Sequence, residues 1–320
     1  MKRTGDARST GFSRKRPNPS RLKAELPTTI VALIDTGIDP NHHALKHALS
    51  PNDGWNFITG DNNFSDDNGH GTQIAGIIVQ SAISNLQSSI KLLPLKALDH
   101  TGAGTVADVV EAMDYAVAHH AAVINCSFGA PAYARALLDA IQRAETAGIV
   151  VVAAAGNNGS NLSQSSFYPA SYRLPNLLSV AASDDHKTLA QFSNFAADIA
   201  APGVGIRTAH RGNRRVSLTG TSASAGFVAG AAALLKSKRG WVSAQTVRET
   251  LLKSADRSVD LAGKVASGVV NPMAAVSLFT RDNAAPVKAP APARRMTPAI
   301  KAAMQAGANL DTLRSSQPQA

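Results

Sequence analysis

Short apolar runs alternate with helical segments along this chain, and the alternation restricts the possible fold more than any other feature. The runs cover 29–34, 90–98, 122–126, 149–155, 177–182 and 198–201. One helical segment begins at 70, and the others cover 106–120, 134–147, 227–235 and 243–254. Continuous apolar runs of this length are typical of parallel strands that are buried on both faces. Their alternation with helices predicts an α/β fold with a doubly wound, mostly parallel sheet and helices on both faces. Pro94 in the second run counts against a central, hydrogen-bonded strand position.

The charge of the chain is concentrated at its two ends. The formal net charge is +10, yet 27–282 contains nineteen basic and nineteen acidic residues, while 1–26 has eight against two and 283–320 five against one. We therefore predict a disordered basic leader at 1–26, a folded domain at 27–282 and a Pro/Ala-rich basic tail at 283–320. Both ends lack interleaved aromatic residues, so nucleic-acid binding is not expected. Any such binding would involve only these basic tails.

No segment resembles an export signal or a membrane span. The leader has no apolar run, and the run at 227–235 is too short to cross a bilayer. Cys126 is the single cysteine, which excludes an intrachain disulfide. The sequence thus predicts a cytoplasmic protein without a membrane partner and leaves open secretion by another route.

A Gly-Thr-Ser turn at 220–222 leads directly into the apolar helix at 227–235. The start of a helix has unpaired backbone N–H groups and the positive end of the helix dipole, which both favour negative charge. Ser222 is therefore placed to attack a carbonyl group while its own N–H stabilises the resulting oxyanion. The alternative is that Ser222 only caps the helix.

Three other polar motifs occupy comparable positions. Asp-Thr-Gly at 35–37 follows a strand, His-Gly-Thr at 70–72 opens a helix, and Gly-Asn at 156–157 follows a strand. The ends of strands are where open α/β sheets place their sites. Taken in order with Gly-Thr-Ser at 220–222, the motifs resemble those of the subtilisin-like serine peptidases over roughly residues 28–280.

This resemblance implies that 27–282 is a serine endopeptidase domain that cleaves peptides or proteins through an acyl-enzyme intermediate. Ser222 would be the nucleophile, His70 the general base and acid, and Asp35 the group that orients the imidazole. The Asn157 amide and the Ser222 N–H would form the oxyanion hole. The resemblance does not determine the physiological substrate or the oligomeric state. It also leaves open whether the leader is self-cleaved, and whether the role is bulk turnover or dedicated peptide maturation.

The resemblance also implies where a substrate binds. Two segments would hold an extended peptide between them as an added strand, Gly102-Ala103-Gly104 and Ser127-Phe128-Gly129. The pocket for the side chain before the scissile bond would lie between the second segment and Ala153 to Gly156, with Ala154 and Gly156 among the substrate-binding residues. Phe167 stands where the family usually has a small residue at the pocket floor. An inward ring predicts cleavage after small side chains; the alternative is that the loop shifts and Phe167 packs against the core.

No cofactor and no metal site are predicted. The chain has neither a glycine-rich phosphate loop nor Cys/His metal spacing. At the position of a calcium ligand in the family stands Ala44, and 80–89 lacks acidic residues. A weak cation site near Ala170, Tyr172 and Asp198 stays open.

The sequence departs from the family after the serine, where Gly226 replaces a usual proline and loosens the first helical turn. The alternative function is a catalytically silent protein of the same fold that binds peptides, or serves as a scaffold whose basic tails hold an acidic partner.

Overall fold

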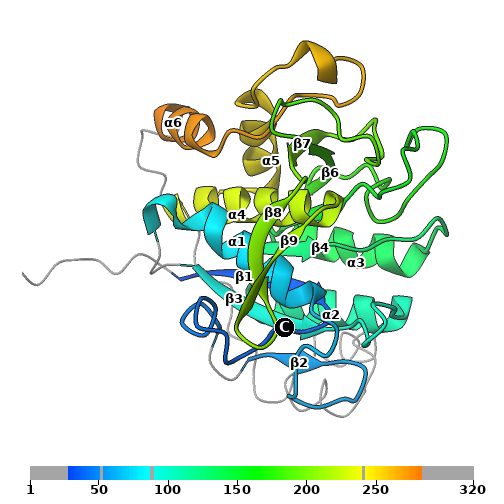
Figure 1. Ribbon diagram of the computed structural model, residues 1–320, viewed down its shortest axis with the longest axis vertical. Coiled ribbons are helices and arrows are strands. Elements are labelled where there is room, and N and C mark those ends of the chain that lie inside the picture. The colour runs from blue at the N-terminus through cyan, green and yellow to red at the C-terminus, as the bar shows by residue number, and fades with distance from the viewer. Residues whose placement is uncertain (1–27, 51–52, 87–89, 240–241, 283–320) are drawn as a thin grey trace, which may run out of the picture.

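Seven parallel strands form the central sheet of this computed structural model, which describes residues 28–50, 53–86, 90–239 and 242–282 (Figure 1). The strands lie in the order β2-β3-β1-β4-β5-β6-β7, and every pairing between neighbours is parallel. Their bounds are β1 Thr29–Asp35, β2 Trp55–Asn56, β3 Ile90–Lys96, β4 Val123–Cys126, β5 Val150–Ala154, β6 Leu177–Ser183 and β7 Ile199–Pro202. The predicted leader at 1–26 and tail at 283–320 lie outside the described residues.

Helices cover both faces of this sheet, which confirms the predicted fold class. Side chains alternate between the faces of a strand: Val31 and Leu33 of β1 join one core cluster, whereas Ala32 and Ile34 join the other. The first cluster is completed by helices α1 His70–Leu86, α4 Thr221–Lys238, α5 Ala244–Lys253 and α6 Pro272–Asp282. The second is completed by α2 Val106–Ala118 and α3 Arg135–Thr146.

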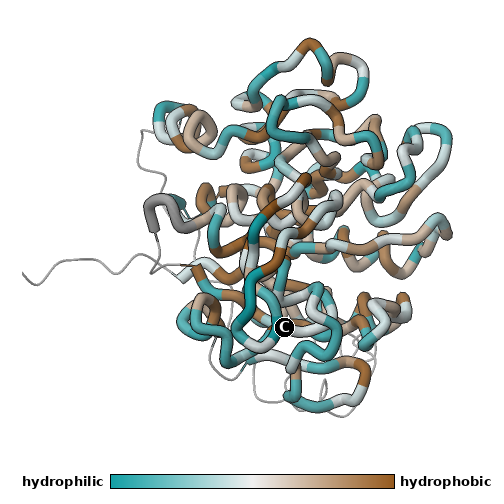
Figure 2. The backbone as a smooth tube through the Cα atoms, in the orientation of Figure 1, coloured by the Kyte–Doolittle hydropathy of each residue, from teal (hydrophilic) through white to brown (hydrophobic). Residues whose placement is uncertain are grey.

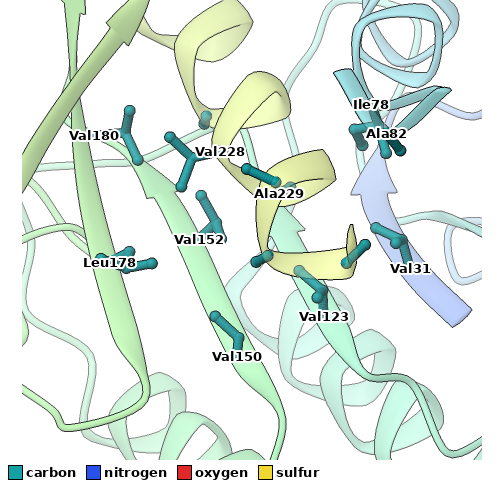
Figure 3. Close-up of a cluster of buried hydrophobic side chains, with 14 of the residues drawn as sticks. Val31, Ile78, Ala82, Val123, Val150, Val152, Leu178, Val180, Val228 and Ala229 are labelled. Carbon is teal, nitrogen blue, oxygen red and sulfur yellow. The ribbon is translucent and has the colours of Figure 1, made fainter. Parts of the chain in front are cut away.

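Helix α4 is the centre of the first core cluster. Figure 3 shows Val228 and Ala229 of α4 against the valines of β5 and β6. Because α4 is packed on most sides, its apolar residues do not follow one face, as predicted for a buried helix. A Cβ on Gly230 would clash with Ser81 and with the backbone of Ile78, so this glycine allows the close approach of α1.

Strand β3 accommodates Pro94 although it lies between β1 and β2. Leu92 exchanges backbone hydrogen bonds with Ala48 and Ser50 on the side of β3 that faces away from β1. The backbone N–H and C=O groups of the even-numbered residues of β3 therefore point to that side. Strand β2 pairs only with Leu95 and Lys96. The nitrogen of Pro94 therefore faces the gap before β2, where no ladder hydrogen bond is lost.

Three elements were not predicted from the sequence: the antiparallel hairpin of β8 Ile206–His210 and β9 Arg214–Leu218, the short helix η2 Val259–Leu261, and α6. The hairpin is rich in arginine and has no continuous apolar run, so it lacked the signal that identified the other strands. Its polar character contrasts with the apolar strands of the interior in Figure 2. Across the described residues, no helix has both the length and the apolar character needed to cross a membrane.

Candidate active site

Asp35 and His70 meet where β1 ends and α1 begins. The Asp35 carboxylate is fully buried, and its Oδ1 accepts hydrogen bonds from His70 Nδ1 and from the Thr36 N–H, both at 2.8 Å. A buried acceptor that binds Nδ1 leaves the other ring nitrogen, Nε2, free to accept a proton. The pair therefore has the geometry of an oriented general base.

The environment of His70 shifts its basicity upward. Burial lowers the pKa of the imidazole, but the charge and the hydrogen bond of Asp35 outweigh burial, and the charge of Asp66 adds to them. The pKa of His70 is consequently raised above its ordinary value of 6.5. The protonated imidazole is thus stabilised, as it must be after it removes a proton from a nucleophile.

Asp66, which was not predicted as a site residue, connects the start of α1 to the end of β1 through hydrogen bonds. Its buried carboxylate accepts hydrogen bonds from the Thr36 hydroxyl, from the N–H groups of Asn68, Gly69 and Thr72, and from the Thr72 hydroxyl, at 2.5 to 3.0 Å. Thr36 follows Asp35 and Gly69 precedes His70, so this network fixes the two catalytic candidates relative to each other. The only sequence signal was an acidic residue shortly before a helix.

Ser222 lies in the first turn of α4, as its motif predicted. In the described part of the chain its hydroxyl donates to the backbone oxygen of Ser127 at 3.0 Å and makes no hydrogen bond to His70. The hydroxyl must leave Ser127 to reach Nε2 of His70. Catalytic hydrogen bonds that are absent in the free enzyme often form only when substrate is bound.

Asn157 is held with its amide nitrogen available to a ligand. Its Oδ1 accepts from the backbone N–H of Thr221 at 2.9 Å and from the Thr221 hydroxyl at 3.0 Å. The same hydroxyl accepts from the N–H of Gly156 at 3.1 Å. Because these contacts occupy the oxygen, the Nδ2 donor points away from them. This role of Thr221 has no signal in the sequence.

The two predicted substrate segments leave the carboxyl ends of strands on either side of β1. Gly102, Ala103 and Gly104 follow β3, and Ser127, Phe128 and Gly129 follow β4. The first segment is an exposed loop, fixed by hydrogen bonds from Thr101 and Ala103 to the carboxylate of Asp99. The segments are not hydrogen-bonded to each other within the described residues, and a peptide between them would cross the end of β1.

The Phe167 ring lies between the two strands that border the predicted pocket. A Cβ on Gly129 would clash with this ring, and a Cβ on Gly156 would lie 3.1 Å from its Cδ1. Two backbone hydrogen bonds between Ala130 and Tyr168 fix the neighbouring backbone, at 2.8 and 2.9 Å. Ala154, the last residue of β5, is buried. The ring therefore occupies space between the ends of β4 and β5, and it also packs against the second core cluster, as in the alternative stated from the sequence.

The weak cation site that the sequence left open would lie at a cavity of about 360 Å³, whose lining includes Ala170, Tyr172 and Asp198. Arg248 reaches the same place, because its Nη2 lies 2.6 Å from Asp198 Oδ1 and its Nε donates to the Leu177 oxygen at 2.8 Å. A guanidinium thus already compensates the carboxylate. Among the described residues, no group of three or more His, Cys, Asp or Glu side chains is arranged to bind a metal ion.

Comparison with known proteins gives consistent matches. Residues 27–284 match the model of the subtilase family. The chain is 38% identical over 232 residues to subtilisin DY of Bacillus licheniformis, covering 70% of this chain and 82% of that protein. It is 40% identical over 215 residues to a thermophilic serine proteinase of Bacillus sp. strain AK1, covering 65% of this chain but only 52% of that relative. The crystal structure of a cold adapted subtilisin-like serine proteinase superposes with a TM-score of 0.68 at 27% identity, covering 76% and 88% of the two chains.

These relatives correct the predicted location. The homologous subtilisins are secreted extracellular proteases, so the prediction of a cytoplasmic protein is wrong. The prediction relied on a leader without an apolar run. The single cysteine does not distinguish the two compartments, because many secreted enzymes also lack disulfides.

Proposed function

The chain belongs to the subtilase family and is a serine endopeptidase, and on this basis we propose that Asp35, His70, Ser222 and Asn157 carry out its reaction. The observation that carries this assignment is the 2.8 Å hydrogen bond between the buried Asp35 carboxylate and His70 Nδ1. The comparisons do not favour the alternative of a catalytically silent scaffold.

In the proposed reaction, Nε2 of His70 removes the proton of the Ser222 hydroxyl as its oxygen attacks the peptide carbonyl. Asp35 keeps Nδ1 protonated and stabilises the positive imidazolium. His70 then donates the proton to the leaving amine, and the acyl group stays on Ser222 until water, activated by His70, hydrolyses the ester. The order of events requires the leaving amine to lie beside His70.

The oxyanion of each tetrahedral intermediate would accept hydrogen bonds from Asn157 Nδ2 and the Ser222 N–H. The Ser222 N–H lies in the first turn of α4, where no intrahelical acceptor is available to it. Thr221 holds the Asn157 amide in place before substrate arrives. Fixed donors need no rearrangement as negative charge develops, and one such donor contributes about 3–4 kcal/mol to transition-state stabilisation.

The raised pKa of His70 gives a prediction for the pH dependence. His70 acts as a base only when it is neutral, so activity is present above its pKa and is lost as the pH falls through it. Since this pKa is above 6.5, the acid limb of kcat/KM should have its midpoint above pH 6.5. The measurement is kcat/KM on an uncharged peptide between pH 5 and 9. A midpoint at or below 6.5 would contradict the proposed Asp35–His70 pair.

We also propose that Phe167 restricts cleavage to bonds that follow Ala, Ser or Gly. Its ring occupies the space between Gly129 and Gly156, so a large substrate side chain would have to displace it. Phe167→Gly should raise kcat/KM for peptides with Phe, Tyr or Leu before the scissile bond by tenfold or more, because overpacking costs about 1–3 kcal/mol. The measurement is a peptide series that varies only at this position.

A matched control separates the pocket from general loss of packing. Phe57 is also partly buried, but it packs edge-on against Tyr115 instead of lining the pocket. Phe57→Gly should lower the melting temperature without changing the preference for small side chains. A wild-type enzyme that prefers Phe or Tyr would exclude the proposed role of Phe167.

A further inference from the structure

The folded domain has an uneven charge distribution that its balanced composition conceals. Residues 199–248 contain no Asp or Glu, and the β8–β9 hairpin within them carries four arginines, Arg207, Arg211, Arg214 and Arg215. In the described structure, none of the four lies within ion-pair distance of a carboxylate. The four arginines are therefore not ion-paired in the described structure, and the carboxylate that contacts the hairpin turn, Asp39, binds the Gly212 N–H at 2.9 Å instead of an arginine.

This hairpin is fixed against the beginning of α1, next to His70. The Thr208 hydroxyl donates to the Gln73 backbone oxygen at 2.6 Å, and the Gln73 amide contacts Nδ1 of His210 at 3.0 Å. The His210 ring also occupies the space that a side chain on Gly69, the residue before His70, would need. Figure 1 shows β8 passing alongside α1, with β9 next to β8.

Two of the arginines lie toward the segment that precedes His70, one on the hairpin face that carries His210 and one in contact with Asp67. Arg214 is paired with His210 in the ladder, so both side chains share one face. Arg211 donates from Nη1 to the backbone oxygen of Asp67, three residues before His70. Arg207 is paired with Ser217 and Arg215 with Ala209, which places these two arginines on the opposite face.

His210 itself adds little charge to this surface. Burial lowers the pKa of His210, and the charges of Arg214 and Arg211 lower it further, against the opposing effect of Asp66. The imidazole is consequently neutral at and above neutral pH, and the positive field comes from the arginines. Arg214 is solvent-exposed and Arg211 is half-buried, so both remain accessible to a ligand.

The proposed reaction determines which part of a substrate approaches this surface. The leaving amine lies beside His70, which must protonate it, whereas the acyl side extends toward Ser127 and Phe167. Residues that follow the scissile bond therefore leave along the side where the hairpin packs. We propose that Arg211 and Arg214 bind acidic side chains of the substrate at the first two positions after the scissile bond. This site rests on the proposed peptidase function.

The expected effect is moderate because the site is open to solvent. Guanidinium groups bind carboxylates well, but one exposed ion pair changes an equilibrium by only about 1.5- to 5-fold. Two arginines together should favour an acidic side chain by roughly 3- to 10-fold in kcat/KM. Salt should reduce this preference, since the screening length falls to about 3 Å at 1 M ionic strength.

The test uses pairs of fluorescence-quenched peptides cleaved by the full chain. The members of a pair differ only by Asp or Asn at the first or the second position after the bond, so shape is nearly constant and charge is varied. The wild-type Asp/Asn ratio should be roughly 3 to 10 at low salt and approach 1 in about 1 M salt. It should fall to about 1 in R211Q/R214Q and be retained in R207Q/R215Q, which removes the same charge from the opposite face. A ratio within one enzyme is unaffected by its folded fraction.

The outcomes distinguish this site from the function on which it rests. Equal cleavage of Asp and Asn peptides by the wild type would overturn the acidic site and leave the peptidase assignment intact. A ratio that persists in R211Q/R214Q would overturn it as well. If neither peptide were cleaved and no fluorophosphonate labelled the chain, the proposed function and this site would both fail. A ratio of 1 combined with heparin binding that depends on Arg211 and Arg214 would assign the surface to a polyanion instead.

Discussion

Ser222→Ala is expected to abolish peptide hydrolysis, with a fall in kcat of about 10⁶-fold, the magnitude known for subtilisin, a relative of this chain. The substitution removes the attacking oxygen and its hydrogen bond to Ser127, while the backbone N–H of the oxyanion hole remains. Labelling by a fluorophosphonate should also disappear, because no nucleophile is left to form the covalent bond. The measurements are kcat on a peptide substrate and the mass of the protein after exposure to the probe.

Ser224→Ala is the matched control for this substitution. Ser224 lies half a turn further along α4, and its buried hydroxyl donates to the Ala201 oxygen at 2.9 Å. Losing this hydrogen bond should lower the free energy of unfolding by about 1 kcal/mol and leave both hydrolysis and labelling in place. Wild-type activity in Ser222→Ala would contradict the assignment of the nucleophile.

Asp35→Asn is expected to lower kcat by about 10⁴-fold at neutral pH. The neutral amide neither stabilises the imidazolium nor holds Nδ1 in its protonated form. The change also removes the charge and the hydrogen bond that raise the pKa of His70 and leaves burial, which lowers it. Any residual activity should therefore have its acid limb at lower pH than the wild type, which a pH profile of kcat/KM measures.

Asp256→Asn tests whether removing any hydrogen-bonded carboxylate produces the same loss. The Asp256 carboxylate binds Asn271 and Lys187, both at 2.8 Å, instead of a histidine. This variant should lose stability without a change in kcat or in the acid limb. An Asp35→Asn enzyme with nearly full kcat and an unchanged acid limb would show that Asp35 does not orient His70.

Much of the fold follows from local patterns in the sequence. Strands β1 and β5 match the predicted runs 29–34 and 149–155 to within one residue at either end. The match is close because strands buried on both faces must be apolar throughout. Helix α3 ends before Gly148, whose φ of +75° is a conformation that glycine adopts without strain. The hairpin β8–β9 has neither signal, since Thr208 and Ala209 are buried against α1 whereas Arg207, Arg214 and Arg215 are exposed on the same short strands.

The candidate site was partly accessible from sequence for a related reason. Asp35 ends a strand and Ser222 starts a helix, so each motif lies where its own secondary structure places it. The relation between them is tertiary. The network of Asp66 joins Thr36 to the start of α1, and Asn157 is oriented by Thr221, 64 positions away along the chain. These partners carry no motif of their own.

The sequence by itself determined the alternation of strands and helices, the buried character of α4 and the order of the four motifs, because each of these depends on residues that are close along the chain. Only the tertiary structure decided that the Phe167 ring lies between Gly129 and Gly156, and that the hairpin packs against the start of α1 with Arg211 on the Asp67 oxygen. Both outcomes depend on contacts between segments that are far apart in sequence, such as that of Gln73 with His210, 137 positions apart. Composition does not report such contacts, because the nineteen basic and nineteen acidic residues of 27–282 balance wherever they lie. The electrostatic field at a site, in contrast, depends on the distance of each charge from it.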